Sequence, residues 1–196
     1  MNSNDYVNLL NEKIKYVDDK ELVYLVEKLI EEREYLINIS RIDPLTGVYN
    51  KSVLNYISDF SCIVMCDVDN FKLVNDKYGH LKGDYVIKEI SKILYSNFRK
   101  NDCVCRFGGD EFLIVVDQCD MDIILDRLQS IRRELNNNIS LLELGVTLSI
   151  GVSSTNNKDT LNESIEKADI ALYESKKKGK NCISIFDEVN INSISK

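Results

Sequence analysis

Residues 106–116 read RFGGDEFLIVV, with two adjacent glycines and two adjacent acids between apolar residues. Glycine tolerates positive φ and lets a ligand approach the backbone closely. Gly108 and Gly109 therefore predict a turn with a binding surface, and the apolar residues on either side predict the two strands of a hairpin. Asp110 and Glu111 follow the turn, where carboxylates can hold a metal ion.

A second apolar run, SCIVMCDVD at residues 61–69, predicts a buried strand that ends in acids. Asp67 and Asp69 stand two residues apart, so they project from the same face of the strand. If the hairpin pairs beside this strand, Asp110 reaches the same place. Carboxylate oxygens without a nearby histidine suit Mg²⁺, which leaves coordination positions for water and substrate phosphates. The pattern indicates a nucleoside triphosphate as substrate.

Two further points concern these acids. For Asp69, a role at the metal site is supported no better than a purely structural one, as a solvated residue or as the cap of a following helix. Adjacent strand residues point to opposite faces, so Asp110 and Glu111 are not expected to bind one metal in the same way.

Apolar strands and amphipathic helices alternate along the rest of the chain. Helices are expected over residues 4–17, 20–40, 84–98, 120–137 and 160–178, and strands over residues 61–69, 102–107, 111–116, 144–154 and 181–186. Hairpins mixed with helical crossovers predict an α/β fold in which helices flank a mixed central sheet. The pattern divides the chain into an N-terminal helical segment (1–40), a main domain (41–187) and a short tail (188–196).

The N-terminal segment has the pattern of two helices joined at VDDK, residues 17–20. Asp18 with Glu21 three residues later predicts a capping box at the start of the second helix. Apolar residues of that helix recur at coiled-coil spacing, although Glu32 interrupts them: Leu22, Leu25, Leu29, Leu36 and Ile39. The stripe predicts either dimerisation or packing against the chain's own domain, with equal support for each.

Composition restricts the class of protein. The 196 residues, 44% hydrophobic and 29% charged, fit one soluble domain with an appendage. A net charge of −7 argues against a nucleic-acid backbone as the main partner. No apolar segment approaches the roughly 20 residues that span a bilayer, and the N-terminus lacks the pattern of a signal peptide. We therefore expect a cytoplasmic protein without a membrane span.

The six cysteines do not predict a metal site, because no CxxC pair occurs and the single histidine is distant from them in sequence. Cys62 and Cys66 stand at even spacing on a strand pattern, as do Cys103 and Cys105. Each pair should share one face of its strand and behave as small buried hydrophobic residues.

The heptad RFGGDEF resembles the signature turn of the GGDEF-domain diguanylate cyclases. Four other segments resemble motifs of this family in the same order: DPLTGVYNK (43–51), DVDNFKLVNDKYGHLKGD (67–84), TLSIGVS (147–153) and ADIALYESKKKGKN (168–181). The resemblance covers roughly residues 41–187. It implies a palm-like nucleotidyl cyclase fold and the condensation of two GTP into cyclic di-GMP with release of two pyrophosphates.

The resemblance also implies roles for individual residues. Asp67, Asp110 and the Val68 carbonyl would hold Mg²⁺, or alternatively Mn²⁺, with Glu111 nearby. The metal would polarise the α-phosphate and lower the pKa of the attacking ribose 3′-hydroxyl. Asp110 is also the family's proposed proton acceptor, although a metal-bound carboxylate is a poor base. Lys72 would stabilise the negative charge that develops on the phosphates.

Asn75 and Asp84 match the residues that bind guanine in this family. A carboxylate accepts from the N1–H and N2–H₂ groups of guanine but faces a bare lone pair in adenine, so Asp84 should reject ATP. His80 either contacts substrate or is structural. Phe71 either lines the base pocket or, as its apolar side chain favours, lies in the core.

Lys176 and Lys180 would hold the β- and γ-phosphates, and the backbone at Gly108 and Gly109 would approach the substrate. A solvated basic helix end, favoured by the helix dipole, explains the same lysines without a ligand. The family usually has arginine at the positions of Lys180 and Lys51. Lysine keeps the charge but loses the bidentate geometry toward phosphate.

Arg99 and Asp102 stand upstream of the glycine turn at the spacing of the family's RxxD product-inhibition motif. Arginine can bind a guanine edge or a phosphate with two hydrogen bonds, and aspartate can accept from guanine. A surface ion pair at the end of a helix is the alternative. The position of the motif favours the inhibitory site.

Two active half-sites must face each other, because each domain presents one GTP and the product contains two 3′–5′ linkages. The resemblance thus implies a homodimer, with the N-terminal helices raising the effective concentration of one domain about the other. Two competing interpretations are a non-catalytic receptor for cyclic di-GMP or GTP, and a promiscuous cyclase that makes mixed guanine–adenine products. Intact Asp67, Asp110 and Glu111 count against the receptor, since a pure receptor does not need metal ligands.

Overall fold

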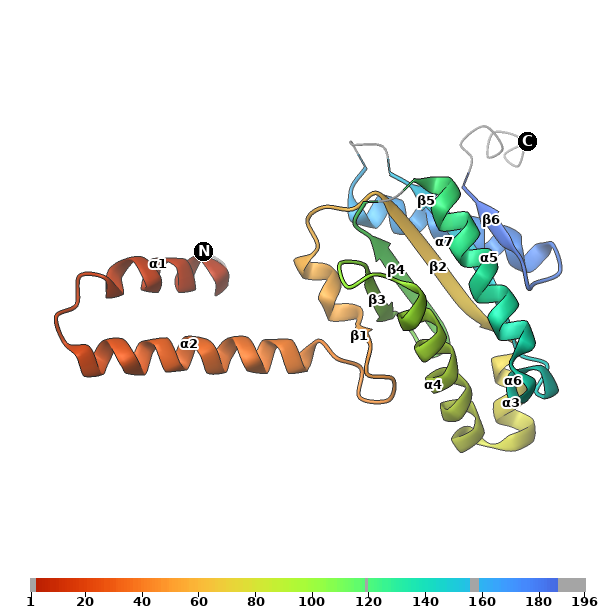
Figure 1. Ribbon diagram of the computed structural model, residues 1–196, viewed down its shortest axis with the longest axis horizontal. Helices are drawn as coiled ribbons and strands as arrows, with labels where there is room; N and C mark the ends of the chain where they lie inside the picture. Colours follow the sequence, from red (N-terminus) through yellow and green to blue (C-terminus); the bar gives the residue numbers. More distant parts are fainter. Residues whose placement is uncertain (1–2, 119, 156–158, 187–196) are drawn as a thin grey trace. The chain divides into compact units, whose positions relative to one another are not determined.

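The computed structural model describes residues 3–118, 120–155 and 159–186. The chain forms two compact units, Met1–Ile42 and Asp43–Lys196. The first unit contains the helices α1 (Ser3–Ile14) and α2 (Lys20–Ser40), so both helices predicted for the N-terminal segment are present (Figure 1).

Helix α2 begins after a different aspartate from the predicted one. Asp19, not Asp18, is its N-cap. The Asp19 Oδ1 atom accepts hydrogen bonds from the backbone N–H groups of Glu21 (3.0 Å) and Leu22 (3.1 Å). The predicted capping box from Asp18 to Glu21 is therefore wrong by one residue, because a side chain caps only from the position directly before the helix.

Helix α2 presents its apolar stripe to solvent within its own unit. None of its residues is buried. The predicted stripe remains about half exposed, with exposed fractions of 48% at Leu22, 51% at Leu25, 65% at Leu29, 58% at Leu36 and 51% at Ile39. The described part of the unit therefore does not cover the surface that the stripe forms.

The second unit is built on a six-stranded sheet in the order β1-β3-β4-β2-β5-β6. Its strands are β1 (Tyr49–Asn50), β2 (Cys62–Asp69), β3 (Cys103–Arg106), β4 (Glu111–Val116), β5 (Thr147–Ser154) and β6 (Ile183–Ile185). The neighbours β3 and β4, β4 and β2, and β2 and β5 pair antiparallel, whereas β1 with β3 and β5 with β6 pair parallel. The predicted α/β fold with a mixed sheet and an N-terminal helical extension is confirmed.

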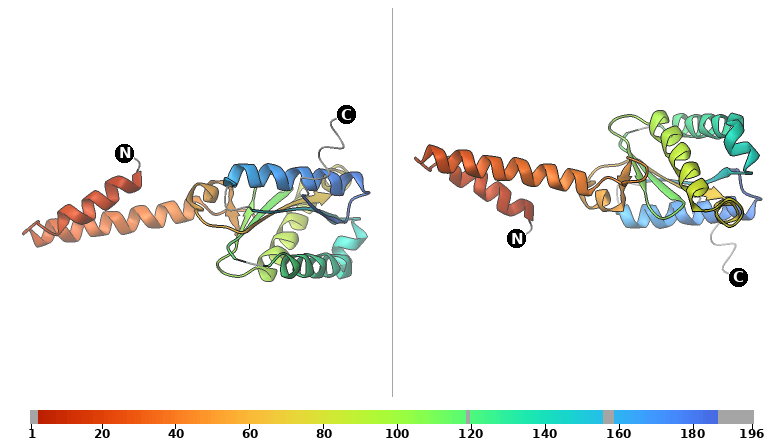
Figure 2. Two further views of the ribbon diagram at one scale, coloured as in Figure 1. Left: turned by 90° about the horizontal axis from the view of Figure 1, so that it is seen from above. Right: turned by 90° about the horizontal axis from the view of Figure 1, so that it is seen from below.

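Helices cover both faces of this sheet, with α4 and α5 on one side and α7 on the other (Figure 2). The helical segments are η1 (Lys51–Tyr56, a 3₁₀ helix), α3 (Phe71–Tyr78), α4 (His80–Asn97), α5 (Met121–Asn137), α6 (Ile139–Glu143) and α7 (Leu161–Lys177). The sequence pattern does not predict α3 or α6, and it places the start of α4 at residue 84. Helices of eight and five residues are too short to show a helical period.

Strand β2 separates two hydrophobic cores because its side chains alternate between the faces of the sheet. Even-numbered residues such as Val64 lie in the core under α4 and α5, whereas odd-numbered residues such as Ile63 lie in the core under α7. The same alternation places the terminal acids of the strand, Asp67 and Asp69, on the α7 side.

The cysteines of the strands occupy both cores. Cys62 and Cys66 belong to the core under α4 and α5, and Cys103 and Cys105 belong to the core under α7. The prediction that each pair shares one face is therefore confirmed. Burial raises the pKa of the Cys103 thiol to about 11 and that of the Cys105 thiol to about 12, so both stay protonated at neutral pH.

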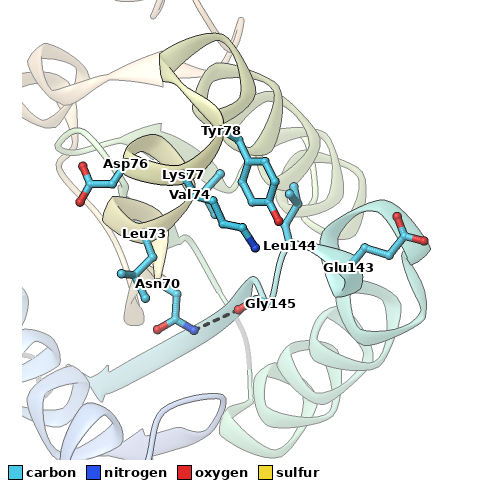
Figure 3. Close-up of a pocket in the computed structure, with 9 residues that line it drawn as sticks. All are labelled: Asn70, Leu73, Val74, Asp76, Lys77, Tyr78, Glu143, Leu144 and Gly145. Atoms are coloured by element: carbon cyan, nitrogen blue, oxygen red, sulfur yellow. Dashed lines mark hydrogen bonds between the residues drawn. The ribbon is translucent and has the colours of Figure 1, made fainter.

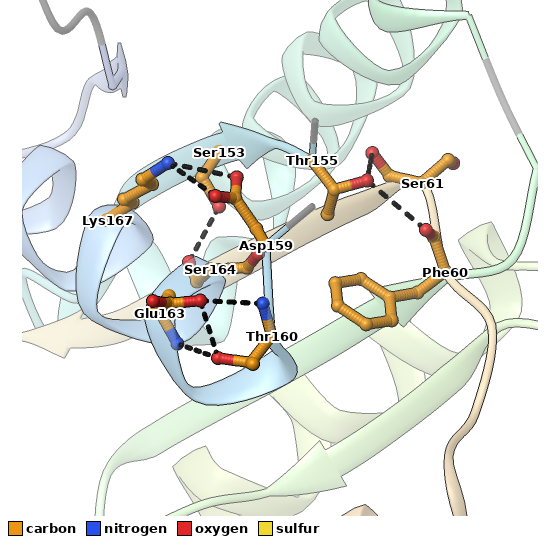
Figure 4. A network of polar contacts seen from close by, with 9 residues as sticks. All are labelled: Phe60, Ser61, Ser153, Thr155, Asp159, Thr160, Glu163, Ser164 and Lys167. Atoms are coloured by element: carbon orange, nitrogen blue, oxygen red, sulfur yellow. Dashed lines mark hydrogen bonds and ion pairs between the residues drawn. The ribbon is translucent and has the colours of Figure 1, made fainter. Parts of the chain in front are cut away.

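Helix α7 packs on β5 without an intervening side chain. At Gly151 a Cβ atom would lie 2.1 Å from the carbonyl oxygen of Ala168 and 2.2 Å from the backbone nitrogen of Leu172. Only glycine allows this approach. A capping box between Thr160 and Glu163 fixes the start of the helix (Figure 4). The position of α7 on the sheet is thus defined both at its start and along its length.

Within the described ranges, none of the helices combines the length and the apolar character of a membrane span. The expected C-terminal tail, residues 188–196, lies outside the described residues.

Candidate active site

The end of β2 and the start of β4 lie side by side. Asp67 pairs with Glu111 in the antiparallel register. The backbone N–H of Val68 donates to the carbonyl oxygen of Asp110 (3.1 Å). The predicted pairing of the hairpin beside the central strand is thereby confirmed. Glu111 lies in β4 directly opposite Asp67, whereas Asp110 precedes the strand, so the two acids of the hairpin occupy different positions.

The turn before β4 does not use the backbone conformation that its glycines predict. Positive φ occurs at four other glycines, and neither Gly108 nor Gly109 is among them. Gly108 instead makes room for an acid, because a Cβ atom there would lie 2.6 Å from Oε2 of Glu111. The turn itself is confirmed: the backbone N–H groups of Phe107 and Gly108 both donate to the Glu111 carbonyl (2.9 and 3.2 Å).

Arg106 fixes this turn. Its Nε and Nη2 atoms donate to the Gly109 carbonyl (3.1 and 2.8 Å), and its Nη1 donates to both carboxylate oxygens of Asp43 (3.3 Å each). Burial opposes ionisation of Asp43, but hydrogen bonds from Thr46 and the Arg106 guanidinium together hold the pKa of Asp43 below its ordinary value. A charged side chain therefore holds the carbonyl group directly before Asp110.

A pocket of about 530 Å³ opens at this end of the sheet. Eight of the residues singled out from the sequence line it: Asp67, Val68, Asp69, Phe71, Lys72, Asp110, Lys176 and Lys180. Six others lie outside its lining: Asn75, His80, Asp84, Gly108, Gly109 and Glu111. The structure thus brings the candidate metal ligands and the candidate phosphate-binding lysines together.

The negative charges of the acids around Asp67 are only partly neutralised by the ammonium group of Lys176. Lys176 Nζ lies 2.6 Å from Asp67 Oδ2. Burial raises the pKa of Asp67 and the Lys176 ammonium opposes this shift, while the charges of Asp110 and Asp69 add to it. Burial, and then the charges of Asp67 and Asp110, raise the pKa of Glu111 as well. This mutual repulsion favours binding of a further cation.

The residues fit a cation that takes few protein ligands. Across the described ranges, no group of three or more His, Cys, Asp or Glu side chains is arranged to hold a metal ion. Asp67 and Asp110 instead line one pocket together with Val68. Two carboxylates and a carbonyl are a donor set that suits Mg²⁺, which completes its shell with water and substrate phosphates.

The helices α3 and α4 meet beside an unsatisfied acceptor. The Oδ1 atom of Asn75 is buried and has no hydrogen-bond partner among the described residues. A Cβ atom at Gly83 would lie 2.0 Å from this oxygen and 3.2 Å from the ring of Phe71, so both side chains pack directly on the glycine. Phe71 contacts the core and also lines the pocket. His80, the first residue of α4, is exposed.

Asp69 is buried and is neither a solvated residue nor a helix cap, so both structural interpretations of it from the sequence are wrong. It accepts hydrogen bonds from the hydroxyl groups of Thr147 and Ser149 (2.7 Å each) and from the backbone N–H of Asn181 (3.0 Å). These partners lie between 78 and 112 residues away in sequence, which no local pattern reveals.

Lys180 is held at the pocket by an asparagine that the sequence pattern does not single out. Its Nζ donates to Oδ1 of Asn70 (2.9 Å), and Nδ2 of Asn70 donates to the Gly145 carbonyl (3.0 Å; Figure 3). Asn70 has positive φ (62°) directly before α3. It also lines a second pocket of about 620 Å³ between α3 and residues 143–145. Lys180 thus contacts a residue that lines both pockets.

Arg99 and Asp102 lie after α4 beside a pocket of about 380 Å³. The buried Asp102 carboxylate accepts hydrogen bonds from the backbone N–H of Arg99 (2.8 Å) and from Nη1 of Arg127 on α5 (3.2 Å). The alternative interpretation, an ion pair between the Arg99 and Asp102 side chains, is therefore wrong. Arg127 stands 25 residues after Asp102, so the motif gives no hint of it.

The family model described as "Diguanylate cyclase, GGDEF domain" matches residues 40–182. The chain therefore belongs to this family, as its motifs predict. It is 37% identical over 127 residues to diguanylate cyclase A of Treponema denticola, which covers 63% of this chain and 34% of that protein. It is 33% identical over 188 residues to diguanylate cyclase DgcZ of Escherichia coli K12, and this match covers 87% of this chain and 62% of that protein. The chain thus spans less than two thirds of both relatives.

Solved structures show the same similarity. The coiled coil and GGDEF domain of DgcB from Caulobacter crescentus, in complex with c-di-GMP, has a TM-score of 0.72 at 25% identity and covers 84% of this chain and 95% of that chain. SiaD from Pseudomonas aeruginosa, in complex with its activator SiaC, has a TM-score of 0.66 at 26% identity and covers 93% of this chain and 77% of that chain.

Proposed function

We propose that the chain is a diguanylate cyclase, which condenses two GTP into cyclic di-GMP and releases two pyrophosphates. The observation that carries the proposal is the single pocket lined by Asp67, Asp110, Lys176 and Lys180. Acids that favour a further cation and lysines that suit phosphate together match a nucleoside triphosphate with its metal. Family membership and the names of the relatives support the same activity.

Guanine recognition rests on Asn75 and Asp84. The unpartnered Oδ1 of Asn75 is an acceptor for an N–H group of the base, which relieves the cost of burying it unpaired. The Asp84 carboxylate accepts from the N1–H and N2–H₂ groups of guanine. Adenine has a lone pair at N1 and is rejected, since two acceptors would face each other. Phe71 provides an apolar wall, and the exposed His80 is a further substrate contact.

The phosphates lie against the lysines of the pocket. Lys176 and Lys180 bind the β- and γ-phosphates, and their ammonium groups already lie at the pocket, where they donate to Asp67 and Asn70. Lys72, exposed at the pocket, stabilises the charge that develops during transfer. At Gly109 a Cβ atom would meet nothing within 4 Å, so the backbone of the turn is open to the substrate there, whereas the Glu111 carboxylate occupies this space at Gly108.

Asp67, Asp110 and the Val68 carbonyl would hold Mg²⁺, or Mn²⁺ in its place. When bound, the metal polarises the α-phosphate and lowers the pKa of the ribose 3′-hydroxyl. Glu111 lies opposite Asp67 and adds negative charge, which strengthens binding of the cation. Asp110, directly after the turn, is the family's proposed acceptor of the hydroxyl proton, and this role competes with metal binding because a metal-bound carboxylate is a poor base.

A homodimer is required because one domain presents only one of the two nucleotides. Residues 1–40 form the segment that joins the copies. The half-exposed stripe of α2, which includes Leu25, Leu29 and Leu36, supports this assignment because its coiled-coil spacing suits an identical helix. The segment raises the effective concentration of one catalytic domain about the other.

Product inhibition is assigned to Arg99 and Asp102. The Arg99 guanidinium makes no ion pair within the described residues and can bind a guanine edge or a phosphate of cyclic di-GMP. Asp102 is held in place beside the pocket by Arg127, whose Nη1 atom lies 3.2 Å from Asp102 Oδ2. The position of this pocket away from Asp67 makes the inhibition allosteric.

The test is incubation of the purified protein with Mg²⁺ and equal concentrations of GTP and ATP, with products identified by mass. We expect cyclic di-GMP alone. Asp110→Ala should lower the rate by at least about 1,000-fold, as loss of a group that acts on the transition state does, and should not lower the unfolding temperature. Asp76→Ala is the matched control, because this exposed acid lines the same pocket and has no assigned role.

Other outcomes favour the competing interpretations. Mixed guanine–adenine dinucleotides would overturn the specificity assigned to Asp84 and identify a promiscuous cyclase. Absence of product at high protein concentration, together with binding of cyclic di-GMP, would identify a non-catalytic receptor.

A further inference from the structure

The loop after α7 has an unusual backbone. Three consecutive residues have positive φ: Gly179 (106°), Lys180 (67°) and Asn181 (46°). Side-chain-bearing residues rarely adopt this conformation, and two of them in succession persist only where surrounding contacts hold them. Lys180, which lines the main pocket, is therefore carried by a loop that must be held in place.

Several contacts hold the loop from the α7 side of the sheet. The backbone N–H of Lys180 donates to the Ser175 carbonyl (3.1 Å), and its Nζ donates to Asn70 (2.9 Å). The backbone N–H of Asn181 donates to the buried Asp69 carboxylate (3.0 Å). These contacts fix the N–H groups of the loop but leave the oxygen atoms of Asn181 to another partner.

That partner is Arg132 on α5. Its Nη2 donates to the Asn181 carbonyl, and both Nε and Nη2 lie 3.4 Å from the Asn181 side-chain oxygen. Its remaining terminal nitrogen, Nη1, donates to Gln129 on the same helix (3.0 Å). Arg132 thus directs its charged donors at the residue next to Lys180, and Asn181 is held from two sides by Asp69 and Arg132.

Arg132 is not needed to attach α5 to the sheet. That attachment comes from the buried stripe on its inner face: Ile124, Leu128, Ile131 and Leu135. Arg132 itself is half-buried and is absent from the lining of the pocket that contains Lys180. Any influence of Arg132 on substrate must therefore pass through Asn181.

We infer that Arg132 is a positioning residue for the triphosphate: by clamping Asn181 against Asp69, it holds the strained loop that aims Lys180 into the pocket. The inference rests on the proposed function, since it assigns the pocket to a nucleotide. The arginine acts on the phosphate end of the nucleotide and not on the base, because Asn75 and Asp84 belong to α3 and α4. Loss of Arg132 should therefore weaken binding of a nucleoside triphosphate, whose terminal phosphates reach Lys180, more than binding of a nucleoside monophosphate.

The experiment compares two guanine nucleotides that cannot be joined to a second one. The full chain is titrated with 3′-deoxy-GTP and 3′-deoxy-GMP in Mg²⁺ by calorimetry, because both lack the attacking hydroxyl group. Arg132→Ala should weaken 3′-deoxy-GTP binding about tenfold, the effect of losing a charged hydrogen bond, and change 3′-deoxy-GMP binding less than about twofold. Arg132→Lys should recover part of the loss.

Two further variants separate positioning from general damage. Arg133→Ala is the matched control, because Arg133 is exposed on the same helix and, among the described residues, its side chain donates hydrogen bonds to Gln129 and Ser130 of that helix. It should bind both nucleotides as the wild type does. The double variant Arg132→Ala with Lys180→Ala should bind 3′-deoxy-GTP no more weakly than Lys180→Ala alone, because the arginine acts through the lysine.

The inference is overturned if Arg132→Ala binds 3′-deoxy-GTP like the wild type, weakens both nucleotides equally, or adds its full effect to that of Lys180→Ala. If Arg132→Ala does not fold, Arg132→Gln keeps the stem and a donor and serves the same comparison. A wild-type chain that binds neither nucleotide would overturn the proposed function and this inference with it. A wild type that binds 3′-deoxy-GTP beside an unaffected Arg132→Ala overturns this inference alone.

Discussion

Helices α2 and α5 have the same kind of apolar stripe, but only one of the stripes is buried. In α5, four stripe residues are fully covered by the sheet and by α4: Ile124, Leu128, Ile131 and Leu135. In α2, which is longer, no residue is buried and Leu29 is 65% exposed. Periodicity therefore predicts both helices correctly but does not distinguish a stripe that the chain covers from one that it leaves open.

The difference also separates two functions. The polar edge of α5 places Arg127 at Asp102 and Arg132 at Asn181, so this helix both completes the core and positions two candidate sites. The stripe of α2 has no such partner in the described part of its own unit, and a second copy of the chain suits its spacing. We expect substitutions in α5 to change stability and those in α2 to change association.

The largest expected effect is on the free energy of unfolding, and it compares a leucine from each of the two stripes. Leu128→Ala should lower the free energy of unfolding by about 3 kcal/mol, because it removes buried atoms and leaves a cavity. Leu29→Ala should change it by less than about 0.5 kcal/mol, as substitutions at exposed positions do. Urea unfolding of the two variants, at a protein concentration where the chain is monomeric, makes the measurement. Equal losses would mean that the α2 stripe is covered within one chain.

Association is the next test. Leu29→Glu should lower the rate of cyclic di-GMP synthesis about tenfold at low protein concentration, with recovery at high concentration, because it places charge in the proposed dimer contact. Glu32→Leu should raise the rate at low protein concentration, since Glu32 interrupts the apolar stripe and leucine would complete it. Glu34→Gln is the control, because Glu34 lies on the opposite side of the helix. The assay is the specific rate over a dilution series, and a rate independent of concentration in all variants would remove α2 from the dimer contact.

The candidate inhibitory site, which Arg127 on α5 supports, should give an effect of similar size that is confined to inhibition. Arg99→Ala should raise the concentration of cyclic di-GMP that halves activity by about tenfold, as expected for the loss of a charged hydrogen bond, and should leave the uninhibited rate unchanged. Arg127→Ala should raise it less, because Arg127 orients Asp102 and lies one step further from the product. Inhibition curves that stay unchanged in both variants would place the inhibitory site elsewhere.

The smallest effect concerns stability within the catalytic unit. Burial, with the charges of Asp67 and Asp110, raises the pKa of Glu111 above its ordinary value of 4.5. Below that value Glu111 is protonated in both folded and unfolded chains, and as pH rises through its folded pKa the ionised form costs the folded state free energy. Glu111→Gln should therefore raise the unfolding temperature at pH 7 by about 2 °C without added metal, a gain limited by solvent screening.

The gain should vanish at acidic pH. Glu163→Gln provides a control of opposite sign, because hydrogen bonds within the Thr160 capping box lower the pKa of Glu163. This glutamate stabilises the folded chain above pH 4.5 and loses that effect as pH falls through its folded pKa, so its replacement should lower the unfolding temperature at pH 7. Thermal scans from pH 4 to pH 8 follow both variants.

The long elements are predictable because each carries its own periodicity. The apolar run of β2, the hairpin around Gly108 and the stripes of α5 and α7 all appear in the structure close to their expected bounds. Helix α3 is missed because it has only eight residues, and α6 because it has five. Such short helices depend on tertiary packing more than on their own pattern.

The pocket is predictable where a strand end and a turn supply the residues, as Asp67 and Asp110 do. It is not predictable where the contact joins distant segments. Asp69 is read as a surface acid because its partners on β5 and in the loop after α7 lie far along the chain. Arg132 has the pattern of a solvated helical residue, and only the folded chain brings it to Asn181.

The close packing of α7 on Gly151 couples the size of the residue at position 151 to the position of Lys176 near the C-terminal end of α7. A Cβ atom there would lie 2.1 Å from the backbone of α7, so Gly151→Ala has to lift the helix from β5. Lys176 stands one turn beyond Leu172, the residue that this methyl group would displace. A substitution at Gly151 can therefore move Lys176 within the candidate pocket although Gly151 does not line it, and alignments restricted to the pocket lining would overlook the change.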